Sequence, residues 1–250
     1  FPYRSFARKA DAVAYEAELI QSRSRGGRAQ AKEWREMTLA EYWARWSTEF
    51  RTRVSKGWRI SQDQVWRDHI NPILGKTLIV EVSRSDIAAV LLKAEEKGLG
   101  PQTRIHIWNL LHKMFDDAVE ELDALDASPV RKSLRPEAPK VSRAFLEPHT
   151  ARQFLAHAAN DYIGPAVWLM TLAGLRIGEA QGLRWEDVDL ENRQMLICRQ
   201  WNRKVMAFGP PKNGKPIRVP ILPELAEYLF AVRPKDWKPE DLVMKGKRRG

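Results

Sequence analysis

The sequence is poor in cysteine and lacks both a long apolar run and a recognisable leader. Cys198 is the single cysteine among 250 residues, which excludes an internal disulfide and with it a small disulfide-bonded scaffold. Its setting, MLICRQ, predicts a thiol buried in a strand, which fits a reducing cytoplasm. No apolar run approaches the roughly 20 residues that a bilayer requires, and no signal peptide is recognisable, so we expect no membrane partner.

Positive charge, by contrast, is in excess. There are 42 Lys and Arg residues against 32 Asp and Glu, a formal net charge of +10. This excess favours a polyanionic partner, with nucleic acid ahead of a membrane surface, although a merely basic soluble protein would have the same composition. With 30% charged and 44% hydrophobic residues the chain is expected to be globular, and its length leaves room for two compact domains.

Helix signals, linkers and turns divide the chain into five parts. They are residues 1–27, the end of a small unit with a strand at 3–6, a helix at 9–21 and a basic stretch from residue 22; 28–37, a linker; 38–127, a helical domain; 128–143, a second linker; and 144–250, a second domain. A disordered basic arm is the alternative for residues 1–27. The second linker is rich in proline and carries Arg131 and Arg143, so it suits a strap along DNA or an ordinary interdomain connection.

Residues 38–127 are expected to hold four helices. The starts are assigned to Thr38, Ser61, Ser85 and Pro101, with Pro72 stopping the second helix and Gly98 ending the third. Apolar residues at helical spacing predict a compact bundle. Its polar faces carry candidate contacts to a phosphate backbone and base edges, for which a solvated face is the alternative: Arg59, Gln64, Arg67, Thr103, Arg104 and Lys113.

The second domain is expected to mix helices and strands. A helix through Phe154 and Leu155 is followed, after residue 190, by strands at 194–199, 205–208 and 217–221 and by a helix at 223–232.

The stretch at 171–190, TLAGLRIGEAQGLRWEDVDL, lies between that first helix and the strands. Gly174 is suited to end one helix, and Arg176 then lies in the first turn of the next, where free N–H groups already carry positive charge. An arginine there favours a nearby anion such as a phosphate. Glu179, one turn on, is placed to orient the guanidinium, and a plain Arg–Glu surface pair is the alternative.

The stretch at 210–221, PPKNGKPIRVPI, is the second with chemical content. Asn213-Gly214 is a strong hairpin signal, which would place Lys212 just before the tip and Lys215 just after it. Such a hairpin could carry an ammonium group into a DNA groove, toward a leaving oxygen. An exposed basic turn is the alternative.

These two stretches resemble motifs of the tyrosine recombinases, the phage integrase family. AGLRIGEAQGLRWEDVDL resembles the family's first arginine box, which usually reads like GLRxxEhxxLxWxDhD, and residues 210–221 resemble its lysine hairpin. The resemblance extends to a helical core-binding domain at 38–127 and, through fewer features, to an arm-binding module at 1–27. It implies a mainly α fold with a small antiparallel β-sheet: the core-binding domain plus the N-terminal part of a mixed α/β catalytic domain.

The resemblance also implies roles and partners. Arg176, supported by Glu179, would stabilise charge on a pentacoordinate phosphate, and Lys212, with Lys215 as second choice, would protonate the departing 5′-hydroxyl. Arg218 would be structural or contact the DNA backbone. The implied activity is site-specific recombination that integrates or excises phage or mobile-element DNA through a 3′-phosphotyrosine, without metal or cofactor. The implied partners are duplex DNA that resembles an attachment site, on which the protein forms a tetramer, and DNA-bending accessory proteins. The implied location is the cytoplasm, in association with the nucleoid.

Parts of the family pattern are absent from the sequence as given. All five histidines precede the arginine box, so no HxxR box follows it, and the last tyrosine, Tyr228, lies in a helix whose pattern predicts core packing. We expect the chain alone to be inactive and the native protein to continue beyond Gly250; a first residue of Phe1 also indicates a trimmed piece. The alternatives are a non-catalytic duplex-DNA-binding protein derived from a truncated integrase and, third, a helical RNA-binding protein.

Overall fold

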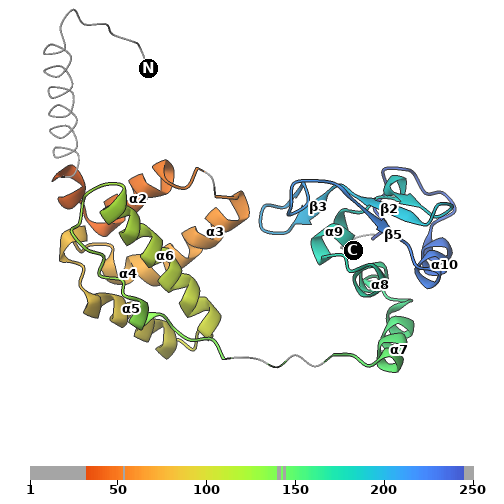
Figure 1. Ribbon diagram of the computed structural model, residues 1–250, viewed down its shortest axis with the longest axis horizontal. Helices are drawn as coiled ribbons and strands as arrows, with labels where there is room; N and C mark the ends of the chain where they lie inside the picture. The colour runs from red at the N-terminus through yellow and green to blue at the C-terminus, as the bar shows by residue number, and fades with distance from the viewer. Residues whose placement is uncertain (1–31, 53, 140–141, 143–144, 245–250) are drawn as a thin grey trace, which may run out of the picture. The chain divides into compact units, whose positions relative to one another are not determined.

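Two units make up the chain, residues 1–141 and 142–250. The computed structural model describes residues 32–52, 54–139, 142 and 145–244 (Figure 1). The strand and helix expected within 1–27 lie outside the described residues. Helices build the described part of the first unit, and the second combines helices with two small antiparallel sheets. The expected fold class, mainly α with a small antiparallel β-sheet, is confirmed.

Side-chain caps fix where two helices of the first unit begin. At α2 the Thr38 hydroxyl accepts from the Glu41 N–H (3.3 Å), and the Glu41 carboxylate accepts from the Thr38 N–H (2.8 Å). Ser83 and Asp86 form the same reciprocal pair at α5. The elements of this unit are α2 (Leu39–Glu49), α3 (Lys56–Val65), the π-helical η1 (Trp66–Ile70), α4 (Asn71–Leu74), α5 (Arg84–Glu96), α6 (Pro101–Glu120), and the 3₁₀ turns η2 (Ile79–Glu81) and η3 (Lys132–Leu134).

Two of the expected helix starts are wrong. The second helix, α3, begins after Ser55 and not at Ser61, and α5 begins after Ser83 and not at Ser85. In both cases an earlier serine accepts a hydrogen bond from a backbone N–H of the first turn and so acts as the cap. The expected starts at Thr38 and Pro101, and the end of α5 near Gly98, are confirmed.

Pro72 does not stop the second helix as expected. A π-helical turn precedes it, in which the Asn71 N–H donates to Trp66 O, and Pro72 then lies in the first turn of α4. Proline has no N–H, so no intrahelical hydrogen bond is donated at this position, and the chain continues through it after the π-helical turn instead of ending there.

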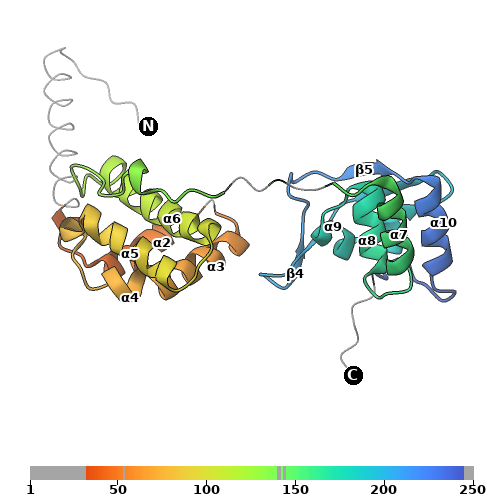
Figure 2. The ribbon, with the colours of Figure 1, turned by 90° about the horizontal axis from the view of Figure 1, so that it is seen from below.

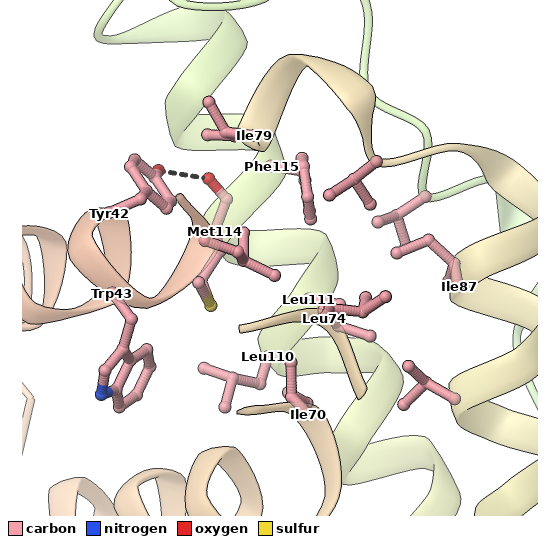
Figure 3. Packing of buried hydrophobic residues seen from close by; sticks show 14 of the residues in the cluster. Tyr42, Trp43, Ile70, Leu74, Ile79, Ile87, Leu110, Leu111, Met114 and Phe115 are labelled. Carbon is pink, nitrogen blue, oxygen red and sulfur yellow. Dashed lines mark hydrogen bonds between the residues drawn. The ribbon is translucent and has the colours of Figure 1, made fainter. Parts of the chain in front are cut away.

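The core of the first unit extends beyond the expected domain boundaries. Tyr42, Met114 and Phe115 are fully buried (Figure 3), and the Tyr42 hydroxyl donates to Met114 O at 2.6 Å. Trp34, from the segment expected to be a linker at 28–37, is fully buried in the same core. Val130, from the linker expected at 128–143, is 4% exposed there. Parts of both segments therefore belong to the packed unit, because their apolar side chains complete its core.

The described part of the second unit keeps the expected order of helices and strands, but it contains two strands that were not expected, at residues 188–189 and 200–202, and the strand expected at 194–199 ends at residue 197. Its members are α7 (Pro148–Ala158), α8 (Gly164–Ala173), α9 (Ile177–Gly182), the 3₁₀ turn η4 (Trp185–Asp187), β1 (Val188–Asp189), β2 (Gln194–Ile197), β3 (Gln200–Asn202), β4 (Ala207–Gly209), β5 (Ile217–Pro220) and α10 (Pro223–Val232). Gly174 ends α8 with φ 66°, as expected. The Tyr228 ring stacks on Trp168 with centroids 4.3 Å apart, so its expected core packing is confirmed.

The strand pairings of the second unit are nested. β2 pairs with β1 and with β5, and Ile197 of β2 lies opposite Ile217 of β5. Further along the chain from β2, β3 pairs with β4, and Gln200 lies opposite Gly209. The result is one interrupted hairpin whose tip is residues 203–206 (Figure 2). The hairpin expected at residues 213–214 is therefore wrong: residues 210–216 are a loop in the returning arm, between β4 and β5.

Cys198 differs from its expected setting. It lies in the break between β2 and β3 and is half-buried, not buried within a strand. Its Sγ lies 3.4 Å from Asp187 Oδ1, and burial, followed by that carboxylate, raises the pKa of the thiol. Among the described residues, no helix is both long and apolar enough to cross a membrane.

Candidate functional site

Glu179, in the first turn of α9, binds Arg176, the residue just before the helix. Arg176 is the residue that caps the helix, and an arginine side chain has no atom that can accept a hydrogen bond. The Glu179 carboxylate instead accepts from the Arg176 N–H (2.9 Å) and from its Nη1 (2.8 Å). The Glu179 side chain is 9% exposed and that of Arg176 58%. The guanidinium is thus anchored from beneath and open to solvent above, where a bound anion could reach it.

The helix α9 also lies directly on strand β3 (Figure 1). A Cβ atom added at Gly178 would stand 2.7 Å from Trp201 O, and one added at Gly182 would stand 3.1 Å from Gln200 Cα. Only glycine allows so close an approach of helix and strand backbones. The helix start that carries Arg176 is therefore fixed to β3.

Lys212 lies in the loop 210–216, at the second position of a tight turn. The Gly214 N–H donates to Pro211 O at 2.8 Å, and Gly214 has φ 72°. Pro211 is buried, whereas Lys212 and Lys215 are exposed. The expectation that the 213–214 pair forms a turn is thus confirmed locally, although that turn is not the hairpin tip.

Gln200, which lies in neither of the two sequence motifs, connects this loop to α9. Its Nε2 donates to Pro210 O at 2.8 Å, and its Cβ would lie 3.7 Å from a Cβ at Gly178. The element that holds Arg176 and the loop that holds Lys212 therefore touch the same residue. No local signal could have identified Gln200, because its partners are close only in the folded chain. Arg218 is exposed on β5, opposite Leu196 of β2.

The candidate DNA contacts of the first unit differ in how their side chains are engaged. Arg59 donates from Nε to Val54 O (2.9 Å) and from Nη2 to Thr52 O (2.8 Å), which closes the loop ahead of α3. Gln64 is exposed on the same helix, and Thr103 near the start of α6 is half-buried. Arg59 consequently has a structural role, and contact to DNA stays a prediction for it.

Three further cations of this set are in ion pairs. The pairs are Arg67 with Asp68 (2.7 Å), Arg104 with Glu95, and Lys113 with Asp117 (2.6 Å). Asp117 is 3% exposed and also accepts from Trp46 Nε1 (2.9 Å), so Lys113 neutralises a buried carboxylate. Arg67 remains 69% exposed, and its hydrogen bond lowers the pKa of Asp68.

The segment at 128–143 holds two further candidate DNA contacts, Arg131 and Arg143. Arg131 is exposed, and its carbonyl accepts from Trp108 Nε1 (3.3 Å), which ties its segment to the first unit. Arg143 lies outside the described residues. Within the part of the chain that the structure describes, no group of three or more His, Cys, Asp or Glu side chains is arranged to hold a metal ion.

Similar proteins share these features of fold and sequence. A curated relative, the ICEBs1 integrase of Bacillus subtilis (strain 168), is 26% identical over 174 residues, which cover 68% of this chain and 47% of the relative. The chain therefore spans about half the length of that relative.

Two solved structures share the fold. The Tn1549 transposon integrase in complex with a circular intermediate DNA has a TM-score of 0.71 at 23% identity, covering 86% of this chain and 73% of that one. The lambda integrase tetramer bound to a Holliday junction has a TM-score of 0.67 at 17% identity, covering 99% and 72%.

The sequence profile of the phage integrase family matches residues 144–243, the part that contains Arg176, Glu179 and Lys212. The resemblance stated from the arginine box and the lysine hairpin is thereby confirmed: residues 144–243 form a domain of the phage integrase family, the tyrosine recombinases.

Proposed function

We propose that this chain is the DNA-binding and phosphate-activating part of a site-specific tyrosine recombinase that integrates or excises phage or mobile-element DNA. The observation that carries the proposal is the Arg176 guanidinium, fixed by the nearly buried Glu179 carboxylate and exposed at a helix start. That arrangement suits the charge that develops on a phosphodiester in the transition state. Family membership of residues 144–243 supports it.

In the proposed reaction a tyrosine hydroxyl attacks the scissile phosphorus and releases its proton to solvent, and the bond from phosphorus to the 5′-oxygen breaks. A phosphotyrosine forms at the 3′ end, and the departing oxygen takes a proton from Lys212, for which Lys215 is the second choice. Glu179 positions Arg176 through the two hydrogen bonds that it accepts. Tyr228 is not proposed as this tyrosine, because it packs in the core.

Duplex DNA is the proposed partner. A tetramer of the protein would bind it at attachment-like sites, with DNA-bending proteins as accessories. The charge of +10 and exposed side chains in both units, among them Gln64, Arg67, Lys215 and Arg218, support this. Arg59, Thr103, Arg104, Lys113, Arg131 and Arg143 complete the proposed contact set.

The test uses the longest form that the reading frame encodes, with a nicked duplex selected by binding from a random pool. We expect a covalent protein–DNA adduct. Arg176→Ala should slow formation of the adduct roughly 100-fold or more, as the loss of one hydrogen-bond donor to the transition state does in other enzymes. Binding to duplex DNA should be largely kept. Arg152→Ala, at an exposed arginine of α7, is the matched control and should change neither quantity.

Three results would overturn the proposal. An Arg176→Ala protein that forms the adduct at the normal rate would remove the assigned role of the guanidinium. Duplex binding by the longest form without any adduct would favour the non-catalytic binding protein, and preference for RNA over duplex DNA at matched salt would favour an RNA-binding protein.

A further inference from the structure

We infer that Gln200 is a positioning residue, which holds the Lys212 loop against the helix that carries Arg176. The inference rests on the proposed function, in which Lys212 gives a proton to the leaving oxygen. Gln200 lies in neither of the sequence motifs, and its assignment comes from three contacts in the second unit.

The first contact fixes the backbone of Gln200. As the first residue of β3 it packs on α9, where a Cβ at Gly182 would stand 3.1 Å from Gln200 Cα. Its Oε1 would lie 3.8 Å from a Cβ at Gly178, so the residue spans the glycine face of the helix. Since Glu179 binds Arg176 from the same short helix, the place of Gln200 relative to the guanidinium is set by rigid elements.

The second contact fixes the entry to the loop. The ladder of β3 and β4 ends at Gly209, opposite Gln200, and Pro210 and Pro211 follow. Neither proline has an N–H, so neither can donate to a further ladder bond. The Gln200 side chain, through its Nε2, donates instead to Pro210 O at 2.8 Å.

The third contact carries this restraint to Lys212. Pro211 is buried, and its carbonyl accepts from the Gly214 N–H at 2.8 Å, which closes the turn with Lys212 at its second position. Lys212 is thus two residues beyond the carbonyl that Gln200 holds. A long, flexible ammonium side chain can protonate one chosen oxygen efficiently only if its backbone is held in place.

Gln200→Glu tests this assignment because it preserves the shape of the side chain. A carboxylate has no N–H to donate and would turn an oxygen toward Pro210 O. Gln200→Met removes the donor without adding charge and should behave alike. Gln194→Glu, at an exposed glutamine of β2, is the matched control.

The measurement compares two nicked duplexes, one with the natural 5′-oxygen at the scissile bond and one with sulfur in its place. In both, the tyrosine oxygen bonds to phosphorus as the bond to the leaving atom breaks. The oxygen leaves with a proton from the donor, whereas sulfur leaves as a stable thiolate and needs none. A defect confined to proton delivery is therefore restored by sulfur.

With the longest form of the protein, we expect Gln200→Glu and Gln200→Met to slow adduct formation about 10–100-fold on the oxygen substrate. Both variants, like Lys212→Ala, should approach the wild-type rate on the sulfur substrate. Arg176→Ala should remain slow on both, because charge on the phosphate must still be stabilised. Gln194→Glu should match the wild type on both.

The alternatives overturn the inference in distinguishable ways. Normal rates for Gln200→Glu on the oxygen substrate, or equal slowing on both substrates, would show that Gln200 does not act through proton delivery. A Lys212→Ala protein with a normal rate on oxygen would remove the donor on which the inference depends. A wild-type protein that cleaves neither substrate would overturn the proposed function itself.

Discussion

At the scale of single residues, Glu179 compensates for an arginine at a position where arginine is a poor cap. Helices favour Ser, Thr, Asp or Asn there because those side chains accept from the first free N–H groups. Glu179 accepts from the Arg176 backbone and guanidinium together, so the direction of the guanidinium is coupled to the direction of the helix. A pairing on the same helix face could be predicted from spacing alone. The burial of Glu179 could not, since neighbours from outside the helix produce it.

Gly178→Ala should destabilise the second unit, by roughly 1–3 kcal/mol, because the added methyl would stand 2.7 Å from Trp201 O and push β3 from α9. Urea unfolding of the full chain measures this change. Gly209→Ala in β4 is the matched control, since a Cβ there meets no atom within 4 Å. Equal stability of the two variants would contradict the close packing of α9 on β3.

At the scale of elements, reciprocal caps decide where helices begin. Ser83 and Ser85 are both serines ahead of the same apolar run, but only Ser83 has an acid three residues on, Asp86, which completes the box. Ser55 caps α3 without such an acid, so the start of α3 carries a weaker signal in the sequence. The π-helical turn ahead of Pro72 likewise has no local signature.

Acid should weaken the start of α2. Hydrogen bonds from the Thr38 side chain and then its backbone lower the pKa of Glu41. A carboxyl whose pKa is lower in the folded state stabilises it fully above the unfolded value and loses this effect as the pH falls through the folded value. Thr38→Val should return the pKa of Glu41 toward its ordinary value, as measured by NMR titration of its side-chain carboxyl. An unchanged pKa in this variant would contradict the cap.

The hairpin of the second unit illustrates how a correct local turn can mislead. Asn213-Gly214 does form a turn, yet β4 and β5 on either side of it pair with different strands. Partner choice between strands depends on which faces can be buried, and here α9 accepts β3 through its two glycines.

At the scale of the whole molecule, the segments between the expected domains contribute to the first unit. Trp34 and Val130 are buried in its core, and Arg135 lies over the Trp108 ring at 5.7 Å. A fragment of residues 28–137 should therefore be more stable than one of residues 38–127. Because the shorter fragment lacks the buried side chains of Trp34 and Val130, its free energy of unfolding should be lower by about 4 kcal/mol or more. Thermal unfolding followed by circular dichroism tests this, and equal midpoints would contradict it.

The sequence by itself determined the helix starts at Thr38 and Pro101, the helix end at Gly174, the pairing of Arg176 with Glu179, and the resemblance of the second domain to the phage integrase family. These features depend on neighbours within a few residues, where backbone geometry and hydrogen bonding are local. Only the tertiary structure decided that Trp34 and Val130 belong to one core, that the hairpin tip is at 203–206, and that Gln200 holds the loop of Lys212. Those contacts join residues far apart along the chain, and they form only when helix, strand and loop surfaces fit together.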